Sequence, residues 1–148
     1  MNEWEFKRRT KQLALRVICL VEALPQNRTA DVIGKQLLRS ATSVGANYRS
    51  ACRGKSIADV VAKLSIVEEE ADETLYWLEL LIESGLMPAE KLKSLISETN
   101  EILAMTVASI KTLRSKDKQS PVKNPESKIQ NRLIQNPPIQ NPKSKIQN

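Results

Sequence analysis

The sequence predicts an all-α protein: an antiparallel up-down-up-down four-helix bundle with a disordered C-terminal tail. Three observations predict it. Within residues 1–114 apolar residues recur at the three- and four-residue spacing of helices, no segment alternates as a strand would, and the connections between helical segments are short. With 148 residues and 41% hydrophobic content, the chain has room for one domain with a core of its own.

The first two helices are bounded by capping residues and helix breakers. The first is expected over residues 3–23, because the residue before Pro25 is pushed away from helical geometry. The second begins near Thr29 or Asp31, whose side chains can cap its first turn. It ends around residues 53–54, where the glycine acts as a C-terminal stop.

The third and fourth helices have equally clear ends. Ser56 opens the third helix, with Asp59 three residues later in a variant of the capping box, and Gly85 closes it. Pro88 takes a first-turn position in the fourth helix, whose apolar stripe continues to Leu113. Short connections between long helices favour antiparallel neighbours, which gives the up-down-up-down order.

Two of the helices are too apolar to be buried on one side only. Residues 13–24 of the first helix and residues 75–82 of the third are hydrophobic on most sides. In a small bundle, helices of this kind need a cover from outside the bundle. We therefore expect the protein to self-associate as a homo-oligomer.

The composition of the chain changes after the fourth helix. Residues 115–148 hold five of the seven prolines and four copies of the tripeptide Ile-Gln-Asn, which predicts a disordered, low-complexity tail after a bundle domain of residues 1–114. The repeats are typical of translated repetitive DNA. The alternative interpretation is that the tail is a nucleic-acid-binding arm. The tail has seven basic and two acidic residues, so only +1 of the net charge of +6 belongs to the bundle.

Composition argues against an enzyme. The absence of histidine removes the commonest general acid-base residue and the commonest transition-metal ligand. Cys19 and Cys52 cannot form a zinc site alone, and Cys19 is expected to act as a small hydrophobe in its apolar run, with a disulfide or a reactive thiol as the alternative. The Gly-Lys-Ser of residues 54–56 lacks the upstream glycine and the strand of a phosphate-binding loop. We expect no catalytic residue, cofactor or metal site.

The sequence also bears on the compartment. The longest apolar run is interrupted by Arg16 and Glu22, far short of the ~20 residues that span a bilayer. The first residues lack the apolar segment and small-residue cleavage site of a secretory signal. A cytoplasmic protein without membrane contact is therefore the expectation.

The antiparallel order of the helices sorts the charges into two halves. Residues 1–16, 42–69 and 102–114 carry 11 bases and 5 acids, a net +6, whereas residues 17–41 and 70–101 carry 5 bases and 10 acids, a net −5. A basic end can bind phosphate backbones through counterion release without reading sequence. It can equally be a solvated helix end, or contact the acidic half of another subunit. The candidate nucleic-acid-binding residues, which we call the basic pole, are Lys7, Arg8, Lys11, Arg49, Arg53, Lys55 and Arg114.

A stripe of small polar residues follows the second helix through the string RSATSVGANYRSACRGKS, residues 39–56. Arg39 and the pair Glu70 and Glu73 lie about equally far from the turn near residue 54, which predicts a buried ion pair that fixes the register of the two helices. Gly45 is expected to let the second helix approach the third closely. The carboxylates could instead hold Mg²⁺ or Mn²⁺, but a di-iron type of site needs histidine. This predicted polar seam comprises Arg39, Ser40, Ser43, Asn47, Glu70 and Glu73.

Two strings in this order, QLLRSATSVGANYRSA from residue 36 and LSIVEEEADETLYWLELL from residue 64, resemble a known family. Its members are four-helix bundle proteins encoded in intervening sequences of bacterial 23S ribosomal RNA genes, related to the accessory variability protein of diversity-generating retroelements. The resemblance covers residues 5–114 and implies a homopentameric ring without enzymatic activity. For the retroelement relative it implies binding of nucleic acid and of a reverse transcriptase through a basic surface. Ser50 stands where members commonly have Glu, so any contact of that acid is missing here.

The leading functional hypothesis is a non-catalytic, ring-forming bundle that associates with RNA or DNA through the basic pole. It would serve as an accessory protein of a reverse transcriptase or of an rRNA intervening sequence. The alternative is a protein–protein interaction scaffold without nucleic-acid binding, whose basic pole meets an acidic surface. Aromatic residues make up only 3% of the chain, which weakens any sequence-specific recognition of single strands.

Overall fold

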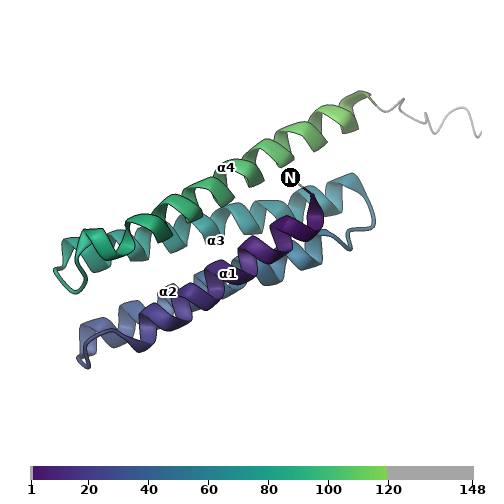
Figure 1. Cartoon of the computed structure of the whole chain (residues 1–148). Helices are drawn as coiled ribbons and strands as arrows, with labels where there is room; N and C mark the ends of the chain where they lie inside the picture. The colour runs from purple at the N-terminus through teal and green to yellow at the C-terminus, as the bar shows by residue number, and fades with distance from the viewer. Residues whose placement is uncertain (1, 120–148) are drawn as a thin grey trace, which may run out of the picture. The chain divides into compact units, whose positions relative to one another are not determined.

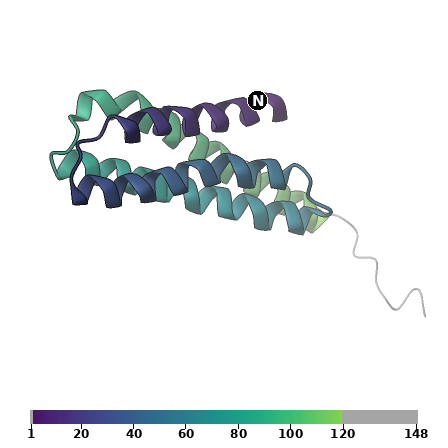
Figure 2. The same ribbon diagram turned by 90° about the horizontal axis from the view of Figure 1, so that it is seen from below.

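The computed structural model describes residues 2–119, and this part of the chain is an all-α bundle, as predicted. Consecutive helices run antiparallel, and Figures 1 and 2 show the first helix beside the second in two views. Residues 120–148, which make up most of the predicted tail, lie outside the described residues. The helices are α1 (Glu3–Glu22), α2 (Arg28–Ala51), α3 (Ile57–Glu83) and α4 (Ala89–Gln119).

An asparagine or serine side chain caps the start of each of the first three helices. Asn2 and Ser56 each accept a hydrogen bond from the backbone N–H three residues on, at 2.8 and 3.1 Å. The cap of α2 is Asn27, which accepts in the same way at 2.9 Å. The predicted start of this helix at Thr29 or Asp31 is therefore too late, because an asparagine at residue 27 already satisfies the first turn.

The connection between α2 and α3 differs from the expected glycine stop. The last residue of α2 is Ala51, and Gly85 is the one glycine with positive φ in the described part of the chain. A Cβ at Gly54 would overlap the side chain of Val60 and lie 3.1 Å from the carbonyl oxygen of Ala51, so lack of space requires glycine there. Gly85, with a φ of 75°, closes α3 as predicted.

One hydrophobic core joins the four helices, and a smaller cluster extends it at one end. The smaller cluster, Ala51, Leu64 and Ile110, lies where α2 ends and α3 begins, and it contains no residue of α1. α4 continues past Arg114, the predicted end of the bundle, because no proline follows Pro88 before residue 121 (Figure 1). The bulky hydrophobic side chains buried completely in the main core are Leu13, Val17, Leu37, Val44, Val67, Leu78, Leu81, Leu92 and Ile102.

The outer side of α1 keeps apolar residues at the surface. Leu15 and Ile18 are 46% and 41% exposed. Cys19 is also exposed, so it is not buried as a small hydrophobe in an apolar run would be. The reason is that α1 buries the stripe through Leu13 and Val17, and residue 19 falls on the other side of the helix. Within residues 2–119, no helix combines the length and the apolar character needed to cross a membrane.

Candidate nucleic-acid interface

A groove between α1 and α2 brings together most of the basic pole. Its volume is about 560 Å³, and small residues such as Thr10 and Gly45 form part of its lining. Trp4, in the first turn of α1, lines it as well. We call it the basic groove and define it by its charged lining residues: Lys7, Arg8 and Lys11 of α1, with Arg49 and Arg53 of α2.

The groove depends on a close approach of α1 to α2. Thr10 is buried, and its hydroxyl donates to the carbonyl oxygen of Phe6 at 3.0 Å, so it has a partner within its own helix. A Cβ on Gly45 would lie 3.4 Å from Oγ1 of Thr10. The predicted role of Gly45 is therefore wrong, since this glycine faces α1 and not α3. The helix that Gly45 faces depends on the rotation of α2 about its axis, and residue spacing alone does not fix this rotation.

Helix geometry arranges the groove cations in two rows. Lys7 and Lys11 are separated by four residues on α1, about 6 Å along the helix axis, and Arg49 and Arg53 have the same separation on α2. Because the two helices are antiparallel, the first turns of α1 lie beside the last turns of α2 (Figure 1). An anionic chain in the groove would therefore have cations on both sides.

Most of these cations have no acidic partner. Lys7 forms an ion pair with Glu3, but both side chains are exposed, and such pairs are weak enough to exchange for another anion. Among residues 2–119, no carboxylate lies within ion-pair distance of the other four groove cations. Their positive charge is thus available to a ligand.

Two members of the predicted basic pole do not line the groove. Lys55 is exposed in the loop before α3, where its backbone N–H donates to the carboxylate of Asp59 at 3.0 Å. This hydrogen bond, with a second one from Lys63, holds the pKa of Asp59 below its usual value. Arg114 is exposed on α4. The structure therefore brings five of the seven predicted residues together.

Arg9, a basic residue between the groove residues of α1, contacts α4 instead. Its guanidinium donates from Nε and Nη2 to the two carboxylate oxygens of Glu98, both at 2.7 Å, and from Nη2 to Glu101 at 2.6 Å. The side chain of Arg9 is only 16% exposed. The hydrogen bonds from Arg9 lower the pKa of Glu98, and those carboxylates in turn raise the pKa of Arg9. Sequence reasoning missed this contact, although acids spaced by three residues in the fourth helix were a signal for it.

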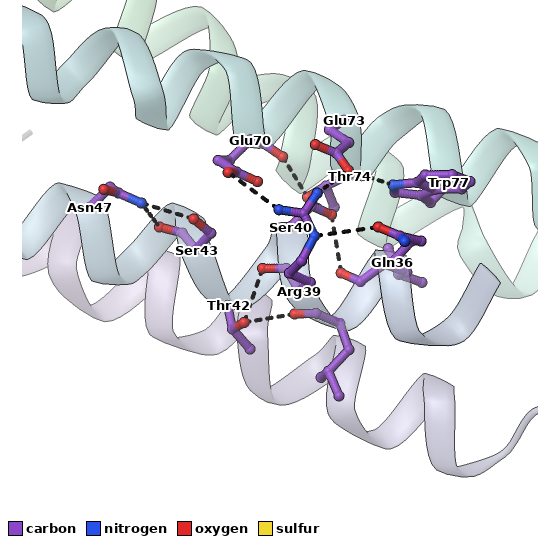
Figure 3. A network of polar contacts seen from close by, with 12 residues as sticks. Gln36, Arg39, Ser40, Thr42, Ser43, Asn47, Glu70, Glu73, Thr74 and Trp77 are labelled. Carbon is purple, nitrogen blue, oxygen red and sulfur yellow. Dashed lines mark hydrogen bonds and ion pairs between the residues drawn. The ribbon is translucent and has the colours of Figure 1, made fainter. Parts of the chain in front are cut away.

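The ion pair of the polar seam is present (Figure 3), but it is not buried. Nη2 of Arg39 lies 2.6 Å from Oε1 of Glu73, which also accepts from Nε1 of Trp77 at 3.0 Å. Glu70 is farther away, with Oε1 4.0 Å from Nη1 of Arg39, and its buried Oε2 has no hydrogen-bond partner in the described part of the chain. Because the Arg39 side chain is 57% exposed, the prediction of a buried pair is wrong.

The small polar residues of the seam make separate contacts. Oγ1 of Thr74 lies 3.0 Å from Oγ of Ser40, and both residues are fully buried between α2 and α3. Ser43 and Asn47, which were expected to flank the ion pair, bond to each other within α2 at 2.8 Å (Figure 3). The buried link between the two helices is thus a neutral pair of hydroxyls, and Thr74 was not among the predicted residues.

Two titratable side chains near the end of α2 have raised pKa values. Burial raises the pKa of the Cys52 thiol and of the Tyr48 hydroxyl, which keeps both groups protonated at neutral pH. Within residues 2–119, no cluster of three or more histidine, cysteine or acidic residues is placed to hold a metal ion. The arrangement around the groove can supply positive charge and one exposed aromatic ring to a ligand.

Comparison with known proteins identifies a family and a similar solved structure. The model of the family described as 23S rRNA-intervening sequence protein matches residues 2–108. A crystal structure of a protein of unknown function from the S23 ribosomal protein family of Bacteroides thetaiotaomicron is 38% identical, with a TM-score of 0.70 over 75% of this chain and 99% of that chain. No match was found among curated proteins.

The contacts of the seam predict an order of stabilities. Replacing Arg39 by Leu should lower the free energy of unfolding by less than about 1 kcal/mol, because an exposed ion pair contributes little. Replacing Thr74 by Val should cost about 1–2 kcal/mol, because it removes a hydrogen bond from the core. Urea unfolding followed by circular dichroism measures both. The reverse order would mean that the ion pair, and not the hydroxyl pair, joins the helices.

The contact between Arg9 and Glu98 predicts a dependence of stability on pH. Because folding lowers the pKa of Glu98 from about 4.5, the pair stabilises the protein above that pH and is lost as the pH falls through the folded-state pKa. Replacing Glu98 by Gln should cost about 1–3 kcal/mol at neutral pH and much less in acid. Unfolding curves at neutral and acidic pH test this, with Glu79→Gln on the surface of α3 as the control. An equal cost at both pH values would contradict it.

Proposed function

We propose that this chain, which belongs to the 23S rRNA-intervening sequence protein family, has a non-catalytic role. In this role it binds the phosphate backbone of RNA or DNA. The basic groove is the binding site in this proposal. The observation that carries it is the pair of cationic rows on α1 and α2, in which four of five side chains have no acidic partner in residues 2–119. Unpaired cations are ready to replace the counterions of a nucleic acid, and the released counterions drive binding.

The contacts available in the groove suggest weak sequence preference. Guanidinium and ammonium groups at this spacing reach phosphates, which are the same for every base. The small floor residues Ala14, Gly45 and Ala46 have no side-chain hydrogen-bonding groups with which to read a base edge. We therefore expect recognition by charge, with affinity that falls steeply as salt is added.

The binding proposal is tested by neutralising one wall of the groove. The double variant Arg49→Gln and Arg53→Gln should bind a labelled RNA or DNA oligonucleotide about tenfold more weakly. The slope of log affinity against log salt should fall by about 0.7 for each phosphate of a single strand that the variant no longer neutralises. Fluorescence anisotropy at several salt concentrations measures both quantities. The matched control is Lys91→Gln with Lys93→Gln, which removes the same charge from the first turns of α4.

The outcomes of that titration are decisive. Equal decreases in affinity for the groove variant and for the control would show that overall charge, and not the groove, attracts the nucleic acid. An absence of binding by the unmodified protein at low salt would remove the proposal and leave the protein-scaffold alternative.

We also propose that the protein acts as a homo-oligomer, a ring of five subunits as the family resemblance implies. The exposed apolar side chains of α1 and α3 support association, since Leu15, Ile18 and Tyr76 are 46%, 41% and 52% exposed. Native mass spectrometry should give a species of about five times 16.6 kDa. A single subunit mass at micromolar concentration would contradict the ring.

A further inference from the structure

Trp4 is an exposed aromatic residue that the bundle does not need for packing. Its side chain is 71% exposed, although it lies in the first turn of α1. It belongs to neither hydrophobic cluster in the described residues, and the aromatic contribution of this end to the core comes from Phe6, whose ring centroid lies 4.3 Å from that of Tyr48. Tryptophan is enriched at interfaces, where its indole can contact a ligand, so the surroundings of this exposed ring are informative.

The indole ring of Trp4 lies beside the groove cations. Trp4 lines the basic groove and is the one aromatic residue among its described lining residues. The guanidinium carbon of Arg8 lies 5.9 Å from the centre of the indole, within reach of a cation–π interaction. An aromatic face next to a row of cations is the combination by which proteins bind single-stranded nucleic acid, since the cations follow the backbone and the ring stacks on a base.

From this juxtaposition we infer that the basic groove binds a single-stranded segment of nucleic acid. One base stacks on Trp4, and the adjoining phosphates lie between Lys11 of α1 and the pair Arg49 and Arg53 of α2. The inference rests on the proposed function and adds the strandedness of the ligand. In a duplex both faces of an internal base are covered by its neighbours, so the indole could not reach them. Stacking accepts every base, which agrees with the small apolar residues Ala14 and Ala46 in the groove lining.

The size of the groove favours a short stretch of one strand. A volume of about 560 Å³ lies within the range of about 300–1,000 Å³ found for sites that hold small molecules. Each wall has a pair of cations one helical turn apart, and Arg8 adds a third cation on the α1 side, so each wall can meet neighbouring phosphates of a strand that passes Trp4. Both RNA and DNA strands share this chemistry.

Tryptophan fluorescence gives a direct test, because the chain contains two tryptophans. The variant Trp77→Phe leaves Trp4 as the single indole, and its emission reports on that ring alone. Titration with an oligouridylate or an oligothymidylate of equal length should quench the emission. An abasic oligonucleotide of the same length should bind through its phosphates without quenching. Equal quenching by the RNA and the DNA strand would show that the protein contacts the base and the phosphate but not the sugar. Stronger quenching by one strand would show which sugar, ribose or deoxyribose, the groove prefers.

A second set of variants keeps the test independent of Trp77. Trp4→Ala should weaken single-strand binding about tenfold and leave duplex binding unchanged, whereas Trp4→Phe, which can still stack, should restore most of the affinity. Tyr76→Ala, which removes another exposed aromatic ring outside the groove, is the control. Binding without quenching, or equal weakening for single strand and duplex, would overturn the inference and leave the proposed function in place. An absence of binding to every oligonucleotide would overturn the proposed function itself.

Discussion

The packing of α1 against α2 around Thr10 and Gly45 brings the groove cations of the two helices together, and the candidate site depends on it. With a hydrogen at position 45, the backbones approach until a Cβ there would lie 3.4 Å from the threonine hydroxyl. The small residues around this point line the groove together with the longer side chains of its cations. A large side chain at position 45 would separate the helices and fill the space that a ligand needs.

Rotation of α1 about its axis matters as much as its distance from α2. Arg9 is held by two carboxylates of α4, so the side of α1 that carries Arg9 faces away from the groove. Lys11 and Arg8 then lie on the groove side with no acidic partner among the described residues. Adjacent basic residues thus have different surroundings: Arg9 joins two helices of the bundle, whereas Arg8 and Lys11 line the basic groove.

The polar groups between α2 and α3 show how burial separates structural from surface interactions. Ser40 and Thr74 are neutral and fully buried, and their hydrogen bond joins the helices without the desolvation of a charge. Arg39 reaches the same boundary from the exposed side and keeps its charge in water. The family resemblance to bundle proteins is carried largely by this region, and its first string also contains Gly45, Ala46 and Arg49 of the basic groove.

The sequence by itself determined the fold class, the order of the four helices and most of their ends, because apolar spacing, caps and breakers act within a few residues of the chain. It also placed the five groove cations at one end of the bundle, since short connections between long helices give the antiparallel order. The tertiary structure decided which basic residues at this end line the groove and which, like Arg9, pair with carboxylates of another helix. It also decided that Gly45 faces α1, and that Trp4 lies beside the cations. Each of these depends on the rotation of a helix about its axis, which side-chain packing between distant segments sets and which no local pattern records.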